Sequence, residues 1–342
     1  MRLLPRLVAL AGLALGLVLI APACETSGQL KSASPSASGA TVHDRAHVAD
    51  TIRVGRATAA AYGMGSVWVS LSAEHGGSVL RIDPRTTEVR EKIAVPVAPD
   101  WEVGGGGLVV TLGSVWVGGR GPGDEGTIAR IDGRTNRVAD TFTLHEGAVA
   151  DLAVNEQGIW ALLSGSAEET QVVRIDPASG EKVGRIPLVG GEGRFIVSAQ
   201  DSILAAIRKG PGGGTLMRID PATNRVDGTF DLGTYPSLAY GEGEAWVVTG
   251  DGLVRIESST GRPAGATADV FSTGDALAVG SDGVWILNPR KNRAVSRVNP
   301  ADGEIDLSVR PVKDATPIAI AVAPGSVWVV NYENSLTRID LR

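Results

Sequence analysis

The chain repeats one pattern seven times along most of its length, and this repeat restricts the possible folds more than any other feature. Its first mark is a tryptophan inside a short apolar run, and successive marks lie about 40 residues apart. The marked positions, with leucine replacing tryptophan once, are Trp68, Trp116, Trp160, Leu204, Trp246, Trp285 and Trp328. A fixed period of this size is typical of solenoids and propellers, in which each repeat is one small structural unit.

The second mark is the tripeptide Arg-Ile-Asp, or a near copy of it, which follows each apolar run. It begins at Arg81, Arg130, Arg174, Arg218, Arg255, Arg297 and Arg338. A turn sequence comes next, as in residues 176–180 and 220–224. In such turns Asp accepts hydrogen bonds from the backbone ahead, Pro presets φ, and Gly or Asn tolerates a left-handed conformation. We therefore expect these acids to stabilise turns rather than to act in chemistry.

Each repeat divides into four strand-like runs, which in the second repeat are residues 108–111, 114–118, 127–132 and 137–144. Short alternating runs separated by turns indicate one antiparallel sheet per repeat. The seventh repeat lacks its fourth run, and residues 49–55 match the fourth runs of the other repeats. The sequence therefore predicts an all-β, seven-bladed β-propeller with four-stranded antiparallel blades over residues 49–342. The N-terminal strand would close the ring by pairing beside Arg338 in the last blade.

Residues 1–23 have the features of a secretory signal peptide: Arg2 and Arg6, an apolar stretch over residues 7–20, and the small-residue ending Ala21-Pro22-Ala23. Cys24, the single cysteine, follows directly and resembles the lipid-acceptor cysteine of bacterial lipoproteins. Two alternatives stay open, because the same ending suits an ordinary signal-peptidase site and the apolar stretch could be retained as a membrane span. One cysteine allows no disulfide within the chain.

Residues 24–48 combine the lipid-acceptor cysteine with a linker rich in Ser, Gly and Ala, whose composition predicts a flexible tether. We therefore expect an extracytoplasmic protein that a lipid such as palmitate on Cys24 anchors to the bacterial cell membrane, with secretion as the alternative. The formal charge of −6 argues against a nucleic-acid partner, because such a partner requires a basic surface.

The pattern Gly-Ser-Val-Trp-Val followed by Arg-Ile-Asp-Pro-x-Thr-Asn-x-Val resembles the virginiamycin B lyase and YVTN group of propellers, over residues 49–342. The resemblance implies a seven-bladed scaffold. For the lyases it also implies a divalent ion and a paired histidine and carboxylate at the mouth of the ring. Because His145 is the one histidine in the corresponding loops, we expect a binding or scaffold module. The alternative is a virginiamycin B lyase-like carbon-oxygen lyase or another propeller hydrolase.

The two faces of such a ring differ in the sequence, since the turns of one face are short and uniform whereas the loops of the other vary in length and chemistry. Variable loops on a rigid scaffold are the usual place for binding. The candidate ligand-binding residues, all placed near the central opening by the repeat, are Trp101, Glu102, His145, Arg194, Tyr235 and Asp275. Trp101 offers an aromatic surface for stacking, and His145 is a weak candidate for a general base.

No cofactor and no resident metal are expected. A quinone-cofactor propeller requires tryptophan after the blade turn, where this chain has Phe142, Ile186 or Phe230. The glycine run at residues 104–107 lacks the Lys-Ser/Thr of a phosphate-binding loop. We expect a monomer whose partner is an extracytoplasmic small molecule, peptide or protein, with membrane contact through Cys24.

Overall fold

The structure, a computed structural model, describes residues 45–74, 76–100, 107–164, 170–210, 213–233, 236–249, 252–257, 259–268, 276–288, 294–310 and 315–342. The chain divides into two units, Met1–Gly39 and Ala40–Arg342, and every described residue belongs to the second. The predicted signal peptide and Cys24 therefore lie outside the described residues. Among the described residues, no helix has the length and apolar character to cross a membrane.

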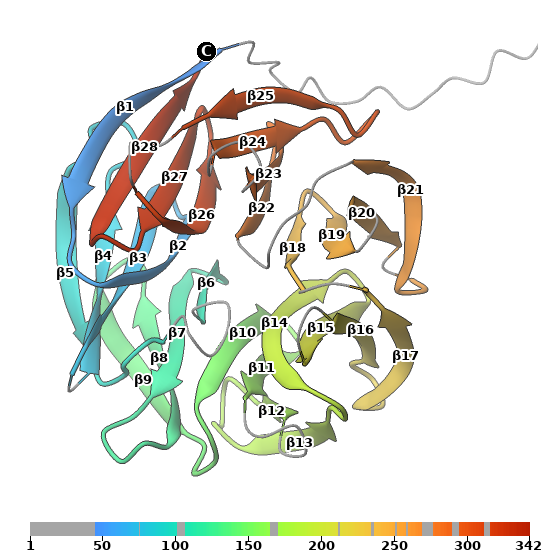
Figure 1. Cartoon of the computed structure of the whole chain (residues 1–342). Helices are drawn as coiled ribbons and strands as arrows, with labels where there is room; N and C mark the ends of the chain where they lie inside the picture. The colour runs from blue at the N-terminus through green and yellow to red at the C-terminus, as the bar shows by residue number, and fades with distance from the viewer. Residues whose placement is uncertain are drawn as a thin grey trace, which may run out of the picture. The chain divides into compact units, whose positions relative to one another are not determined.

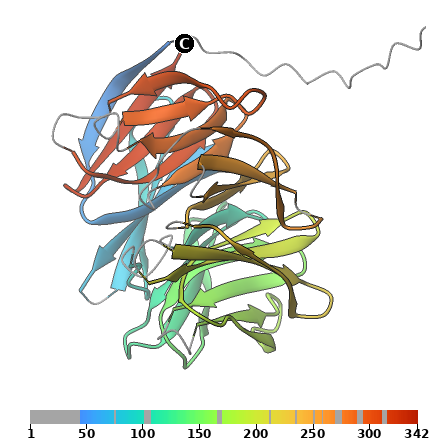
Figure 2. The same cartoon turned by 45° about the vertical axis from the view of Figure 1, so that its right-hand side comes forward.

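Within the described ranges the strands form seven four-stranded antiparallel sheets, which stand as blades around a central axis (Figures 1 and 2). This arrangement confirms the predicted seven-bladed propeller. The first three blades are β2 (Ala57–Gly63), β3 (Ser66–Ala73), β4 (Gly76–Ile82) and β5 (Val89–Val95); β6 (Leu108–Thr111), β7 (Ser114–Arg120), β8 (Gly126–Asp132) and β9 (Arg137–Thr143); and β10 (Val149–Asn155), β11 (Gly158–Leu163), β12 (Gln171–Ile175) and β13 (Lys182–Pro187).

The remaining blades continue the same order of strands from the axis outward. They are β14 (Glu192–Ala199), β15 (Ser202–Lys209), β16 (Gly213–Asp220) and β17 (Arg225–Asp231); β18 (Leu238–Gly241), β19 (Glu244–Thr249), β20 (Gly252–Glu257) and β21 (Arg262–Ala268); β22 (Leu277–Gly280), β23 (Gly283–Asn288), β24 (Ala294–Val298) and β25 (Ile305–Val309); and β26 (Pro317–Ala323), β27 (Ser326–Asn331) and β28 (Ser335–Leu341), completed by β1 (Ala46–Arg53).

The ring closes through β1, which pairs antiparallel with β28 as the outer strand of the seventh blade. Thr51 lies opposite Thr337, and Asp50 lies opposite Arg338. The strand begins at Ala46, so the outer strand is longer at its N-terminal end than the predicted run of residues 49–55. The predicted closure is confirmed, and β1 covers the edge of β28, so the last blade has four strands like the others.

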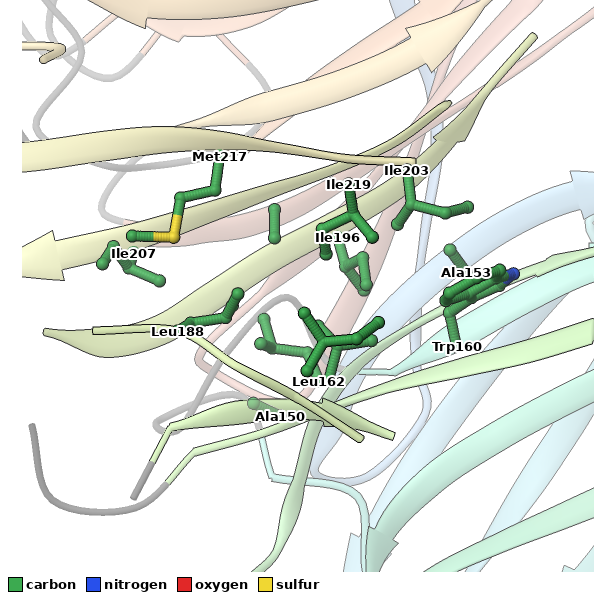
Figure 3. Close-up of a cluster of buried hydrophobic side chains, with 13 residues drawn as sticks. Ala150, Ala153, Trp160, Leu162, Leu188, Ile196, Ile203, Ile207, Met217 and Ile219 are labelled. Carbon is green, nitrogen blue, oxygen red and sulfur yellow. The ribbon is translucent and has the colours of Figure 1, made fainter. Parts of the chain in front are cut away.

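The tryptophan series fills the space between neighbouring blades, as the repeat predicted. Trp68, Trp160, Trp285 and Trp328 are fully buried, and Trp116 and Trp246 are 3 % exposed. Each packs against apolar side chains of the following blade, and Leu204 does so where the tryptophan is missing. Figure 3 shows one such cluster, in which Trp160 lies against Ile203 and Ile219 of the fourth blade. Burial of a large aromatic surface at each junction stabilises the ring.

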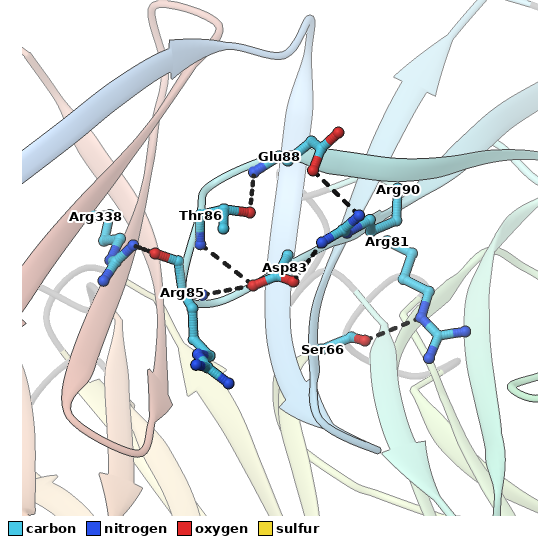
Figure 4. Close-up of polar contacts among 8 residues, drawn as sticks. All are labelled: Ser66, Arg81, Asp83, Arg85, Thr86, Glu88, Arg90 and Arg338. Atoms are coloured by element: carbon cyan, nitrogen blue, oxygen red, sulfur yellow. Dashed lines mark hydrogen bonds and ion pairs between the residues drawn. The ribbon is translucent and has the colours of Figure 1, made fainter.

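The turns between third and outer strands are capped by the repeated acids, also as predicted (Figure 4). In the first blade Asp83 Oδ1 accepts the N–H groups of Arg85 at 2.8 Å and Thr86 at 3.2 Å. Its side-chain bond with Arg90 and these backbone bonds lower the pKa of Asp83 to about 2. Equivalent backbone bonds lower the pKa values of the turn acids Asp132, Asp176 and Asp220. These carboxylates stay ionised at neutral pH, because the hydrogen bonds that they accept favour the charged form.

The arginine of each Arg-Ile-Asp mark lies directly opposite the tryptophan of its own blade, or opposite Leu204 in the fourth, as Arg81 lies opposite Trp68. The Arg81 guanidinium stands 5.0 Å from the centre of the Trp68 ring, a cation–π distance. It also donates to Gly133 O at 3.0 Å and Asn136 Oδ1 at 2.8 Å in the next blade. Arg174 repeats this with Pro221 O and Asn224 Oδ1. In the first and third blades the arginine of the second repeat mark therefore links its blade to the following one.

Candidate functional site: the central cavity

A cavity of about 390 Å³ runs along the axis of the ring and is lined by the innermost strand of every blade. Its wall is largely alanine, valine, leucine and isoleucine. The polar side chains among its lining residues are Thr58, Tyr62, Asp151, Arg194 and Tyr240. A mainly apolar hollow with a few convergent polar groups is the usual form of a small-ligand site.

Three of these polar residues gather at one end of the cavity, because they occupy the same part of their strands. Thr58 is the second residue of β2, while Asp151 and Arg194 are the third residues of β10 and β14. Tyr62 and Tyr240 lie near the opposite ends of β2 and β18. We call the end that carries Thr58, Asp151 and Arg194 the polar end of the cavity.

A local irregularity in the strand places Arg194 in the cavity wall. In β14, Gly193 pairs with Ile207 and Phe195 pairs with Ala206, so Arg194 is an extra residue without a partner in the ladder. Such a β-bulge changes the direction in which a side chain points. The same register shift occurs around Thr58 in β2, and Thr58 Oγ1 there lies 2.7 Å from Ser70 Oγ. Bulges thus put both a cation and a hydroxyl at the polar end.

Asp151 is the buried acid of the site and is only 9 % exposed. Its Oδ2 accepts the Ile196 N–H of the neighbouring blade at 2.9 Å, and the N–H groups of Leu152 and Gly107 also bond to its carboxyl group. Burial raises the pKa of Asp151 to about 7, because the loss of water outweighs these three bonds, which favour the charged form. Near neutral pH the carboxyl group therefore exists in both protonation states.

The structure separates the two predicted site residues that it describes. Arg194 lines the central cavity, whereas His145 lies in a different hollow with Asp124, Glu125 and Glu146. His145 is exposed and has a left-handed backbone with φ of 55°. Trp101, Glu102, Tyr235 and Asp275 lie outside the described residues, as does Cys24. Their proposed roles in binding and lipidation stay predictions.

Glu146, which lines the same hollow as His145, is engaged in ion pairs. It forms ion pairs with Lys182 at 3.1 Å and with Arg185, which come from the outer strand of the next blade. These pairs join the second blade to the third. The described residues include no group of three or more His, Cys, Asp or Glu side chains placed to hold a metal ion.

Sequence reasoning missed Thr58 and Asp151. One signal for Asp151 was available, because it is the single charged residue in the apolar strand Val149–Asn155. A lone acid in a buried strand requires hydrogen-bond partners and has a displaced pKa. Thr58 has no comparable signal, since threonine is an ordinary strand residue. Its place in the cavity follows from the bulge.

Comparison with known proteins supports the architecture. No protein-family model matches the chain, and no curated protein matches it. Among solved structures, the chain is similar to hydrazine synthase from Kuenenia stuttgartiensis, with a TM-score of 0.60 and 14% identity over 84% of this chain and 96% of that one. It is also similar to BamB from Moraxella catarrhalis, with a TM-score of 0.57 and 12% identity over 87% of this chain and 100% of that one. At these identities the likeness shows a shared β-propeller fold.

Proposed function

We propose that this protein is an extracytoplasmic propeller, tethered to the membrane through Cys24, that acts as a ligand-binding or protein-binding module. The observation that carries the binding role is the polar end of the central cavity, where Thr58, Asp151 and Arg194 meet an apolar wall. The tether rests on the signal-like residues 1–23 and on the linker composition.

The chemistry of the polar end favours a ligand with an anionic group and an apolar body. A guanidinium group binds carboxylate or phosphate oxygens through paired N–H donors. Thr58 adds a hydroxyl group, and Asp151 accepts or donates a hydrogen bond according to its protonation state. The alanine, valine and leucine side chains along the inner strands would cover the apolar part.

A ligand screen by thermal shift tests this role, because a ligand that binds the folded state raises the melting temperature. The compounds would be small carboxylates, sugars, peptides and cell-wall fragments. For any compound that binds, Arg194→Gln is expected to weaken affinity at least about tenfold, the loss of one charge-assisted contact. Arg225→Gln removes the same charge from an exposed blade turn and should leave affinity unchanged. Equal affinities for Arg194→Gln and the wild type would exclude the polar end as the site.

The alternative function is a virginiamycin B lyase-like or hydrolase activity, and the pKa of Asp151 favours it. A carboxyl group with a pKa of about 7 is suited to proton transfer at neutral pH. Activity of this kind should disappear in Asp151→Asn, and a lyase of the virginiamycin type should also lose activity in His145→Ala and on chelation. Turnover that survives all three changes would exclude a lyase of the virginiamycin type and a proton-transfer role for Asp151.

A further inference from the structure

Two large apolar side chains stand exposed at the tips of neighbouring turns, in a backbone conformation that does not suit them. Met64 and Leu112 each precede a glycine in the two-residue turn between the inner and second strands, each with φ of 52°. They are 37 % and 53 % exposed. A left-handed residue with a Cβ costs roughly 1–2 kcal/mol, and exposed apolar surface adds nothing to folding. Folding alone therefore gives no reason for the exposed part of either side chain.

The same turn has a different chemistry elsewhere in the ring. In the third to sixth blades this two-residue turn contains an acid: Glu156 and Glu242 stand at the position of Met64, and Asp201 and Asp282 stand one residue later, at the position of Gly65. One side of this face is therefore apolar at its turn tips and the other side is acidic.

Arginines occupy the turn and the strand start beside the apolar tips. A Cβ on Gly133 would lie 2.4 Å from Met64 Cε, so the Met64 side chain crosses the turn that holds Arg134. Gly133 N donates to Gly113 O at 3.1 Å, so the turn that holds Leu112 is bonded to the turn that holds Arg134. Arg137 begins the strand that follows this turn. The tips and the second-blade arginines thus form one continuous surface.

The surface extends to the first and seventh blades. Arg85 occupies the corresponding turn of the first blade, and its carbonyl oxygen accepts a bond from Arg338 of the seventh (Figure 4). Arg45 N donates to Arg342 O at 3.0 Å, just before β1 begins. We call this surface the basic sector; it comprises Met64, Leu112, Arg45, Arg85, Arg134 and Arg137.

The arginines of the basic sector are exposed, and among the described residues none of the four forms a salt bridge. The acids of these turns are already engaged, since Asp83 and Asp132 cap the turn backbone and Glu88 pairs with Arg90. The formal charge of the whole chain is −6, so the cluster of arginines in this sector differs in sign from the chain as a whole. An anionic surface would attract the sector and repel the acidic tips of the third to sixth blades.

The position of the tether identifies which anionic surface is within reach. The segment from Cys24 enters the propeller at Arg45, inside the basic sector. A linker of that length that behaves as the flexible coil its composition predicts would span about 25 Å on average, so a lipid on Cys24 would hold this face close to the bilayer. Basic side chains with neighbouring apolar groups are the usual means by which a protein rests on anionic lipid.

We propose that the basic sector rests on an anionic phospholipid surface, with Met64 and Leu112 in the headgroup layer and the arginines on the lipid phosphates. This proposal rests on the membrane tether proposed above. Thr58 and Met64 lie at opposite ends of β2, so the polar end of the cavity would face away from the bilayer.

Vesicle binding of the unlipidated chain tests the surface separately from the tether. The chain carrying Cys24→Ala, purified without residues 1–23 so that the apolar segment cannot itself bind lipid, would be mixed with vesicles of phosphatidylcholine alone or with a third of phosphatidylglycerol. We expect binding to the anionic vesicles alone, weakened by salt. Arg85→Glu with Arg134→Glu should lower the partition coefficient at least about tenfold. Arg225→Glu with Arg262→Glu, the same change on exposed turns of the fourth and fifth blades, should not lower it.

A second pair of variants excludes unfolding as the cause of lost binding. Met64→Asn with Leu112→Asn suits the left-handed backbone better, so it should raise the melting temperature while it weakens binding. Failure of the folded Cys24→Ala chain to bind anionic vesicles, or equal losses in both arginine pairs, would overturn the proposal. Capture of an acidic protein without vesicle binding would do the same. The tether itself is judged by whether the wild type, but not Cys24→Ala, enters detergent, so the two proposals can fail independently.

Discussion

Thr87 has a backbone conformation that its side chain disfavours. Its φ is 64°, and the equivalent turn positions of the second to sixth blades carry only asparagine or glycine: Asn136, Gly180, Asn224, Gly261 and Gly303. Both asparagines accept a hydrogen bond from the arginine of the preceding blade, at 2.8 Å from Arg81 and 3.1 Å from Arg174. Thr87 offers no such carbonyl to Arg338, which bonds to the Arg85 backbone instead.

We therefore expect Thr87→Asn to stabilise the propeller by about 1 kcal/mol. The change relieves a β-branched side chain in the left-handed region and gives Arg338 a side-chain acceptor across the closing junction. Urea unfolding measures the gain. Thr86→Asn, one residue earlier in the same turn, should give none. A Thr87→Asn protein no more stable than the wild type would contradict this interpretation.

Asp151 should make stability depend on pH near neutrality. Because burial raises its folded pKa from 3.8 to about 7, the folded state holds a proton that the unfolded state releases between these values. Its contribution to stability is therefore complete below about pH 4 and is lost as pH rises towards 7. Relative to Asp151→Asn, the wild type should lose a few kcal/mol of unfolding free energy between pH 4.5 and pH 8. Parallel curves for the two proteins would mean that Asp151 has an ordinary pKa.

Among single residues, the sequence predicted the roles that repeat between blades, whereas it missed the burial of Asp151. The turn acids and the tryptophans were assigned correctly because each occurs in several blades, so their roles are independent of any one neighbour. Asp151 occurs once, and its burial and raised pKa depend on a neighbouring strand that supplies the Ile196 N–H. Arg194 was predicted for the central opening, but its position in a β-bulge depends on the pairing of β14 with β15.

Among the elements, neighbouring blades are joined by two different kinds of side-chain contact. Where the next blade offers asparagine, as at Asn136, the arginine reaches across to it. At Gly180 and Gly261, where it offers glycine, a phenylalanine of the preceding blade occupies the space instead. A Cβ on Gly180 would lie 3.1 Å from the Phe142 ring, and one on Gly261 would lie 3.0 Å from Phe230. Arg130 and Arg218 at these junctions pair within their own blades, with Asp140 and Asp227. The strands were predictable from the sequence, whereas this choice depends on side-chain contacts between blades.

The strand β1 is the element on which ring closure depends. Deleting residues 46–53 should lower the melting temperature of the whole domain by on the order of 10 °C, because it exposes the edge of β28 and loosens a junction that includes Ile52. Differential scanning calorimetry would show the loss. Deleting residues 25–39 shortens the linker and should leave the transition in place. An unchanged transition without β1 would mean that closure contributes little.

At the scale of the whole molecule, the ring creates a site that no single blade contains. Thr58, Asp151 and Arg194 come from the first, third and fourth blades, and the cavity between them exists only when all seven inner strands surround it. The repeat predicted the number of blades and the two unlike faces. It could not predict the reach of side chains across the axis, because that distance depends on strand register and on bulges.

The pairing of β1 with β28 also sets an order of events in the life of the chain. During synthesis from the N-terminus, β1 emerges among the first segments of the propeller and its partner emerges last. Until β28 has been made, β1 and β27 both lack this neighbour. A chain interrupted before β28 would keep these two strand edges open, and open edges favour association with other chains. Ring closure therefore requires a chain that has been synthesised as far as β28.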